Sequence, residues 1–159
     1  MDQQSETKKI CSICKKGHLF EYNGKPLERC DFCRGKARHR VGDFLYRNLL
    51  SDMVGSGARC LHMAPEIAFC DLLSQIFEDG YIAADANPER YPHVDATKMV
   101  LPADFSIFEK ESFQIIIHNH MLEHVPGSYK EHLLGFVDLL APGGMMIFSV
   151  PGPYMDLKT

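Results

Sequence analysis

Residues 58–85 read ARCLHMAPEIAFCDLLSQIFEDGYIAAD, and this stretch decides the fold. It opens with a short apolar run over 58–64 and closes with a second run over 81–84, which stops at Asp85. Between the two runs, Pro65 suits the first turn of a helix, and the apolar residues that follow recur at helical spacing. The stretch therefore predicts a strand, a helix and a second strand.

The same alternation continues toward the C-terminus. FQIIIH at 113–118 predicts a buried strand, a helix with one apolar face is expected over 128–140, and MMIFSV at 145–150 predicts a further strand. A weaker strand is expected near 93–95. Continuous apolar strands that alternate with helices are typical of a parallel sheet covered by helices on both faces. The predicted class is α/β with a mostly parallel sheet.

An amphipathic helix over 39–54 is expected to precede the sheet. Its apolar residues recur at helical spacing, and glycines follow it at once. These residues are Val41, Phe44, Leu45, Leu49 and Met53.

Four cysteines near the N-terminus form two C-x2-C pairs, CSIC and CDFC, separated by a 15-residue spacer. This spacing is typical of a four-thiolate zinc site. Zinc accepts tetrahedral sulfur ligation, and a closed shell of four thiolates leaves no position for water, so the site is expected to be structural. The predicted ligands are Cys11, Cys14, Cys30 and Cys33, within a small zinc-ribbon-like element over 1–38. Cys60 and Cys70 stand among apolar residues and are expected to pack in the core.

Charge is distributed unevenly along the chain, whose formal net charge is −4. Residues 1–40 hold ten Lys/Arg against five Asp/Glu, whereas residues 41–159 hold seven against sixteen. The segment RGKARHR at 34–40 fits either an anion contact or a solvated basic linker. The N-terminal MDQQSETKK lacks the apolar segment of a secretion signal, so a reducing cytoplasmic location is expected, which disfavours disulfides. No apolar run approaches ~20 residues, so no membrane span is expected.

Five blocks of sequence resemble the class I S-adenosylmethionine-dependent methyltransferases. They are CLHMAPE, YIAADANPE, VDATKM, SFQIIIHNHMLEHV and LAPGGMMIFSVP, which together extend over about 58–151. The four-Cys element, the RHR segment and the LH-x-APE turn resemble the bacterial branch that carries an N-terminal zinc element. The resemblance implies a Rossmann-like domain over 39–159, S-adenosyl-L-methionine as cofactor, and methyl transfer to an O or N acceptor on a small molecule or glycan.

The resemblance also implies which residues bind the cofactor. The turn after the first strand would approach the methionine part, the acidic residue that ends the second strand would take both ribose hydroxyls, and an Asp-Ala pair would meet the adenine. The segment after the fourth strand would line the methyl-donor pocket, where His120 is the candidate general base. The implied residues are His62, Ala64, Glu66, Asp85, Ala86, Asp95, Ala96, Asn119 and His120.

Two features depart from the family pattern. His62, Ala64 and Glu66 stand where an acidic residue and two glycines are usual, and glycines there allow the backbone to approach the ligand closely. The family fold also adds a helix and two antiparallel strands after the strand expected at 145–150, so these C-terminal strands are expected to be missing. Either the chain is a fragment, or another chain covers the sheet edge and the protein is an oligomer.

Three other functions compete with this interpretation. His120 to His124 spell H-x-x-E-H, the inverted zinc-peptidase motif, but Pro126 would stop the helix which that motif needs. The basic zinc element could dock RNA as the substrate of a methyltransferase. A non-catalytic module that binds zinc and the cofactor is the third alternative, because the usual glycines are absent.

Overall fold

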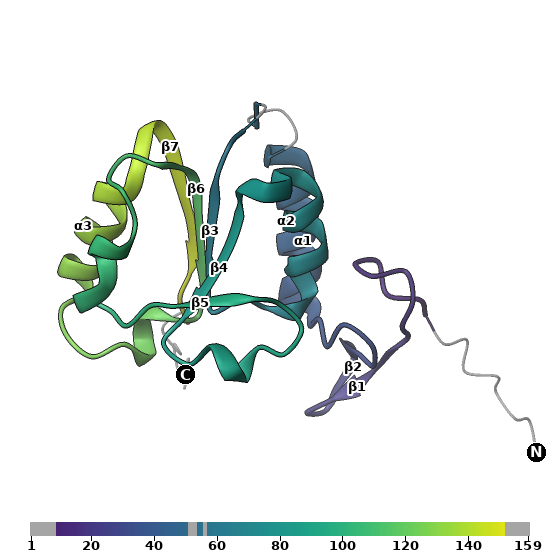
Figure 1. Cartoon of the computed structure of the whole chain (residues 1–159). Helices are drawn as coiled ribbons and strands as arrows, with labels where there is room; N and C mark the ends of the chain where they lie inside the picture. Colours follow the sequence, from purple (N-terminus) through teal and green to yellow (C-terminus); the bar gives the residue numbers. More distant parts are fainter. Residues whose placement is uncertain (1–8, 51–53, 56, 152–159) are drawn as a thin grey trace, which may run out of the picture. The chain divides into compact units, whose positions relative to one another are not determined.

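The computed structural model describes residues 9–50, 54–55 and 57–151 (Figure 1). These residues fall into two compact units. The first, called here the N-terminal unit, takes the described residues of Met1–Val54 together with Glu66–Ile76. The second, called the sheet unit, takes those of Gly55–Pro65 and Phe77–Thr159.

The N-terminal unit begins with an antiparallel hairpin of β1 (Leu19–Tyr22) and β2 (Lys25–Cys30). The chain reverses at Asn23 and Gly24, whose φ values are 53° and 72°. Two consecutive positive φ values are what a type I′ turn requires, and Asn-Gly is the pair that adopts them most readily. The turn therefore sets the register of the hairpin that carries Cys30.

Two helices complete the N-terminal unit, α1 (Ala37–Leu50) and α2 (Ile67–Phe77). Their rings meet where Tyr46 packs edge-on against Phe69, with centroids 4.9 Å apart. A Cβ added at Gly42 would lie 2.8 Å from the tip of the Phe69 ring. The absence of a side chain at Gly42 is therefore what lets the two helices approach closely.

The helix expected over 39–54 forms as α1, but its apolar stripe is not its buried face. The described stripe residues are exposed by 42–66%: Val41, Phe44, Leu45 and Leu49. The buried residues of α1 are instead Asp43, Tyr46 and Leu50. The close approach at Gly42 brings this other face against α2 and so overrides the apolar periodicity. Met53 lies outside the described residues.

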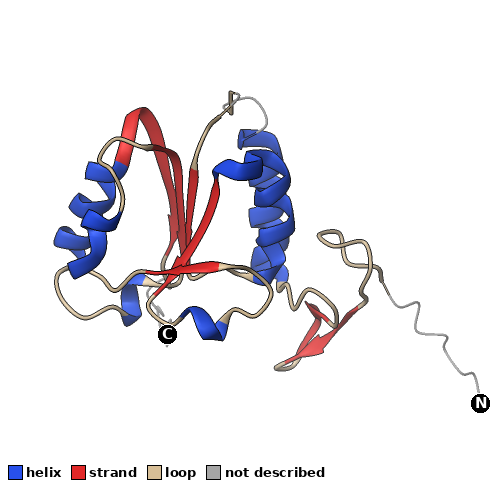
Figure 2. Cartoon of the chain, in the orientation of Figure 1, coloured by secondary structure: helices blue, strands red, loops and turns tan. Residues whose placement is uncertain are grey.

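The sheet unit is built on a five-stranded sheet in the order β5-β4-β3-β6-β7. All four neighbouring pairs are parallel, so the α/β class and the parallel sheet are confirmed (Figure 2). The strands are β3 (Cys60–Met63), β4 (Tyr81–Asp85), β5 (Ala96–Lys98), β6 (Phe113–Asn119) and β7 (Leu140–Ser149). The chain runs outward from β3 to β5 and then returns to the other side of β3 with β6, which creates a switch point between β3 and β6.

The two outer strands differ from the sequence expectation. The weak strand expected near 93–95 is wrong in position, because β5 pairs with β4 only from Ala96 onward. A strand of three residues leaves little periodic signal, so only pairing locates it. The last strand begins at Leu140 rather than Met145, and the ladder to β6 is irregular between these two positions, where Gly143 adopts a φ of 79°.

Helix α3 (Tyr129–Leu139) packs on one face of this sheet. Phe136 is fully buried in the core and meets Phe105 edge-on, with ring centroids 5.1 Å apart. The helix over 128–140 is confirmed, whereas helices on both faces stay a prediction. Short 3-10 turns connect the elements: η1 (Glu78–Gly80), η2 (Pro88–Arg90), η3 (Ala103–Ile107) and η4 (Leu122–His124). No helix in the described part of the chain is long and apolar enough to cross a membrane.

Gly80, just before β4, lies too close to the backbone of Ala58 for a side chain to fit. A Cβ at this position would overlap the backbone carbonyl oxygen of Ala58, which a side-chain rotation cannot relieve. Gly80→Ala is therefore expected to lower the free energy of unfolding by about 1–3 kcal/mol. Gly55→Ala is the matched control, because no described atom lies within 4 Å of its added Cβ. Urea unfolding of both variants checks this, and equal stabilities would contradict it.

Candidate functional site

The four N-terminal cysteines converge on one point in the N-terminal unit. Their sulfur atoms all lie within 4.8 Å of one another. The Sγ atoms of Cys11 and Cys33 are 3.8 Å apart, and those of Cys14 and Cys30 are 3.7 Å apart. Four sulfurs at ~2.3 Å from a central ion in a tetrahedron are separated by ~3.8 Å, so the cluster has the size of a four-thiolate metal site.

Local backbone geometry supports this cluster. A Cβ at Gly17 would lie 2.5 Å from the Cys30 sulfur and 2.6 Å from Phe32 Cβ, so only glycine fits there. The Gly17 N–H also donates to the Cys14 sulfur at 3.4 Å. Such N–H···S bonds orient a thiolate ligand and stabilise its charge.

The electrostatics of the cluster favour a bound cation. Burial raises the pKa of the Cys30 and Cys33 thiols. At Cys14 burial acts in the same direction, but the backbone N–H groups of Gly17 and Lys16 outweigh it and lower the pKa to about 7. A metal binds the four cysteines as thiolates. Four negative charges in a buried cluster are stable only when a cation offsets them.

Two basic residues of the segment 34–40 make internal contacts within the N-terminal unit. The Arg40 guanidinium donates to the backbone carbonyls of Leu27 at 2.9 Å and Glu28 at 3.3 Å. These bonds join α1 to β2, so Arg40 has a structural role. Lys36 lies over the Tyr22 ring at 5.4 Å. The choice between an anion contact and a linker stays open for the remaining basic residues.

A second group of polar residues lies at the carboxyl edge of the sheet. The register aligns Met63 with Ala84 on one side and with His118 on the other. It also aligns Asn119 with Ser149. The residues that follow β3, β4, β6 and β7 therefore emerge at the same edge, where ligands bind in open parallel sheets.

Asp85 ends β4 and already has two internal partners. Its Oδ1 accepts the backbone N–H of Asn87 at 2.8 Å, and its Oδ2 accepts the Tyr91 hydroxyl at 3.0 Å. The side chain is half-buried. A carboxylate has about four lone-pair sites, so two acceptor positions remain for a ligand. Ala86 follows Asp85 and is also half-buried.

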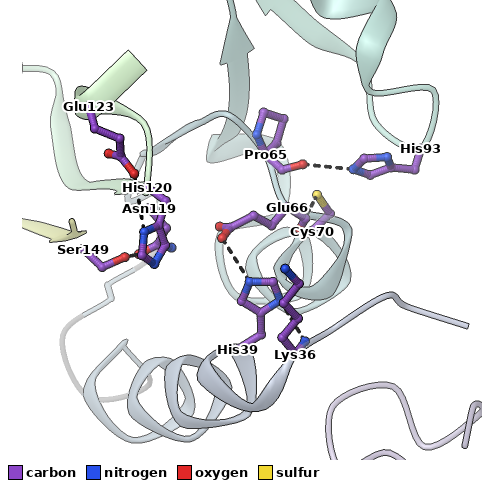
Figure 3. A network of polar contacts seen from close by, with 10 residues as sticks. All are labelled: Lys36, His39, Pro65, Glu66, Cys70, His93, Asn119, His120, Glu123 and Ser149. Atoms are coloured by element: carbon purple, nitrogen blue, oxygen red, sulfur yellow. Dashed lines mark hydrogen bonds and ion pairs between the residues drawn. The ribbon is translucent and has the colours of Figure 1, made fainter. Parts of the chain in front are cut away.

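The turn after β3 contains a residue in the left-handed backbone conformation although the turn has no glycine. Ala64 has a φ of 50°, in the left-handed region that glycine adopts without steric cost. Its N–H donates to the Ala84 carbonyl at 3.0 Å, and the Pro65 carbonyl oxygen lies 3.0 Å from His93 Nε2 (Figure 3). These contacts hold the conformation for which the family pattern uses glycine.

The other two residues expected at this turn lie elsewhere. His62 is fully buried within β3, and its Nδ1 is 2.9 Å from the Tyr81 hydroxyl. Glu66 belongs to the N-terminal unit, where its carboxylate lies 3.5 Å from His39 Nε2. The backbone N–H of Lys36 donates to Nδ1 of the same ring at 3.2 Å, which directs the His39 Nε2–H toward Glu66 (Figure 3).

Asn119 and His120 follow β6 at the carboxyl edge. The Asn119 Oδ1 accepts the Ser149 hydroxyl at 2.9 Å, and the His120 N–H donates to the Ser149 carbonyl at 2.8 Å. His120 adopts a φ of 47°, and its Nδ1 lies 3.5 Å from Glu123 Oε1 (Figure 3). The carboxylate therefore orients the imidazole. Because only the short η4 turn follows, the H-x-x-E-H residues do not share a long helix.

Asp95 and Ala96 lie at the amino end of β5 rather than beyond its carboxyl end. Ala96 pairs with Ala83, two positions before the end of β4, and Asp95 is exposed. The displacement follows from the misplaced third strand. The adenine contact assigned to these two residues stays a prediction.

Three residues at or near this edge were missed by sequence reasoning. Tyr91 and His93 make the contacts given above to Asp85 and Pro65, and nothing in the local pattern indicates them. His118 is fully buried near the end of β6. A polar residue within an otherwise apolar strand was the available signal for His118.

No protein-family model, no curated protein and no solved structure matches the chain.

Proposed function

We propose that the chain is a Rossmann-like, S-adenosylmethionine-dependent methyltransferase with a structural zinc site. The strand order carries this proposal. Counted along the chain from β3, it is 3-2-1-4-5, which is typical of doubly wound sheets that bind nucleotides at the switch point. The left-handed turn at Ala64 and the acidic end of β4 both lie at that edge.

The zinc part of the proposal rests on the cysteine cluster. Sulfur separations of 3.7 and 3.8 Å match tetrahedral zinc, and four thiolates without a water position are typical of structural sites. In this proposal Cys11, Cys14, Cys30 and Cys33 hold the zinc, which stabilises the hairpin and takes no part in the reaction.

The sulfonium cofactor would supply the methyl group together with its own leaving group. The protein would then need to bind the cofactor and the acceptor, to orient the acceptor toward the methyl group, and to exclude water. Asp85 would accept both ribose hydroxyls, and the backbone at Ala64 would pass close to the methionine part. His120, oriented by Glu123, would take the proton from an O or N acceptor on a small molecule or glycan.

Asp85→Asn is the sharpest test of this site. The asparagine oxygen can still accept the Asn87 N–H, and its amide can donate to the Tyr91 oxygen, so both internal contacts survive. The variant loses the charge and the acceptor capacity that a diol needs. We expect an unchanged melting temperature and an affinity for S-adenosylhomocysteine about 10- to 100-fold lower by calorimetric titration.

Tyr91→Phe is the matched control. It removes the internal hydrogen bond to Asp85 and leaves the proposed diol contact in place. We therefore expect a lower melting temperature and a nearly unchanged affinity for S-adenosylhomocysteine. If Asp85→Asn binds S-adenosylhomocysteine as tightly as the wild type, Asp85 is not the ribose contact. If the wild type binds no cofactor at millimolar concentration, the non-catalytic module replaces the methyltransferase.

A further inference from the structure

A cavity of about 450 Å³ lies within the sheet unit, between η4, α3 and the end of β7. This volume is within the range of small-molecule sites, roughly 300–1,000 Å³. Its walls are mainly apolar and include Leu122, Leu133, Phe148 and Val150. Glu123 is the one charged residue among the described residues that line it.

The Glu123 carboxylate has an unused acceptor. Its Oε1 lies 3.5 Å from His120 Nδ1 and 4.0 Å from His124 Nε2. Its Oε2 is buried and has no hydrogen-bond partner among the described residues. A buried acceptor without a donor costs about 1–3 kcal/mol, and more when it carries charge. A ligand in the cavity that brings a donor to the Glu123 carboxylate would offset part of that cost.

A second unpaired polar group lies behind the wall of the cavity. His118 is fully buried, and its ring stacks between Phe136 and Phe148 with centroids 5.1 and 5.0 Å away. Neither ring nitrogen has a hydrogen-bond partner in the described part of the chain. Phe148, whose ring stacks on His118, is also one of the residues that line the cavity, whereas His118 is not.

The negative charge of the Glu123 carboxylate favours cationic ligands over neutral or anionic ones. Burial lowers the pKa of His118 to about 4 against the opposing effect of Glu123, so the imidazole is neutral at pH 7. His118 therefore does not neutralise the Glu123 carboxylate. The wall also contains the aromatic rings of Tyr129 and Phe148, which attract cations through their π faces. A negative group among aromatic and aliphatic walls favours an apolar cation.

We propose that this cavity binds an apolar amine in its protonated form. The ammonium group donates to the Glu123 carboxylate, and the hydrocarbon part packs against Leu122, Leu133 and Phe148. The site goes beyond the proposed methyl transfer, because it requires neither the cofactor nor the residues assigned to the ribose.

The test uses the full chain without S-adenosylmethionine and two probes of nearly equal shape. 2-Phenylethylamine is cationic at pH 7, whereas 2-phenylethanol is neutral. By calorimetric or NMR titration we expect the amine to bind about tenfold more tightly than the alcohol, as a charge-assisted hydrogen bond implies. Glu123→Gln should weaken amine binding about tenfold and leave alcohol binding nearly unchanged.

Glu131→Gln is the matched control, because Glu131 is exposed on α3 and does not line the cavity. It should leave both affinities unchanged. Equal binding of amine and alcohol by the wild type, or no binding of either at millimolar concentration, would overturn the proposal. The wild-type comparison decides the question even if Glu123→Gln fails to fold. Because the titrations contain no cofactor, their outcome is separate from that of the S-adenosylhomocysteine experiment.

Discussion

Replacing Cys30 by serine is expected to release the metal and unfold the β1–β2 hairpin while the five-stranded sheet stays folded. A two-stranded hairpin alone is at best marginally stable in water. A structural zinc site contributes about 10–16 kcal/mol of apparent binding free energy, which is lost when the site cannot close. The sheet unit has its own core around Leu61, Ile116 and Phe136, so it does not depend on the metal.

Two measurements check this expectation on the full chain. Metal analysis should find one zinc per wild-type chain and well below one in the variant. Amide hydrogen exchange should lose protection in 19–30 and keep it in 113–119. Cys70→Ser is the control, because a serine hydroxyl can still donate to the Glu66 carbonyl that Cys70 contacts at 3.3 Å. Persistent hairpin protection without metal would refute the structural role of zinc.

Acidification is expected to destabilise the sheet unit through His118. Burial lowers the pKa of His118 to about 4, from 6.5 in the unfolded chain. Between these values the unfolded state binds the proton and the folded state does not. Stability from this residue is therefore fully present above pH 6.5 and lost as the pH falls to 4. The shift corresponds to about 3 kcal/mol.

His118→Phe should abolish this contribution. The new ring can keep the stacking on Phe136 and Phe148, and the substitution removes two buried nitrogens that have no hydrogen-bond partner in the part of the chain that the structure describes. We expect the variant to be about 1–3 kcal/mol more stable than the wild type at pH 7, and the difference to widen as the pH falls. Because protonation of the thiols also releases metal at low pH, the difference between the two urea unfolding curves is the measurement.

His132→Phe is the matched control for this substitution. His132 is equally buried, but its Nε2 lies 3.0 Å from the Pro126 carbonyl oxygen. The same replacement there should destabilise the protein, because it leaves that carbonyl without its partner. If His118→Phe shows the same pH dependence as the wild type, His118 is not the group that titrates.

Much of the architecture follows from local patterns. The apolar runs around β3, β4 and β6 predict buried strands because each is short and bounded by turn residues, and those at β4 and β6 also contain β-branched and aromatic residues. The C-x2-C pairs predict a metal cluster because their chemistry acts over a few residues. These parts of the chain need no distant partner to be recognised.

The carboxyl-edge residues were only partly foreseeable. That Asp85 and Asn119 end strands could be predicted, because the apolar runs stop there. That Tyr91 binds the Asp85 carboxylate, and that Ser149 binds the Asn119 amide, could not. These partners come from other segments, and only the fold of the chain brings them within hydrogen-bond distance.

The sequence by itself determined the α/β class, the four-cysteine cluster and the main strand ends, because periodicity and spacing are local properties. The tertiary structure decided three other features. It selected the face of α1 that carries Tyr46 over the apolar stripe, because Gly42 lets Phe69 approach there. It moved the third strand to Ala96–Lys98, because a short strand is located only by the backbone hydrogen bonds of its neighbour. It left His118 without a hydrogen-bond partner among the described residues, because two rings from distant segments enclose it.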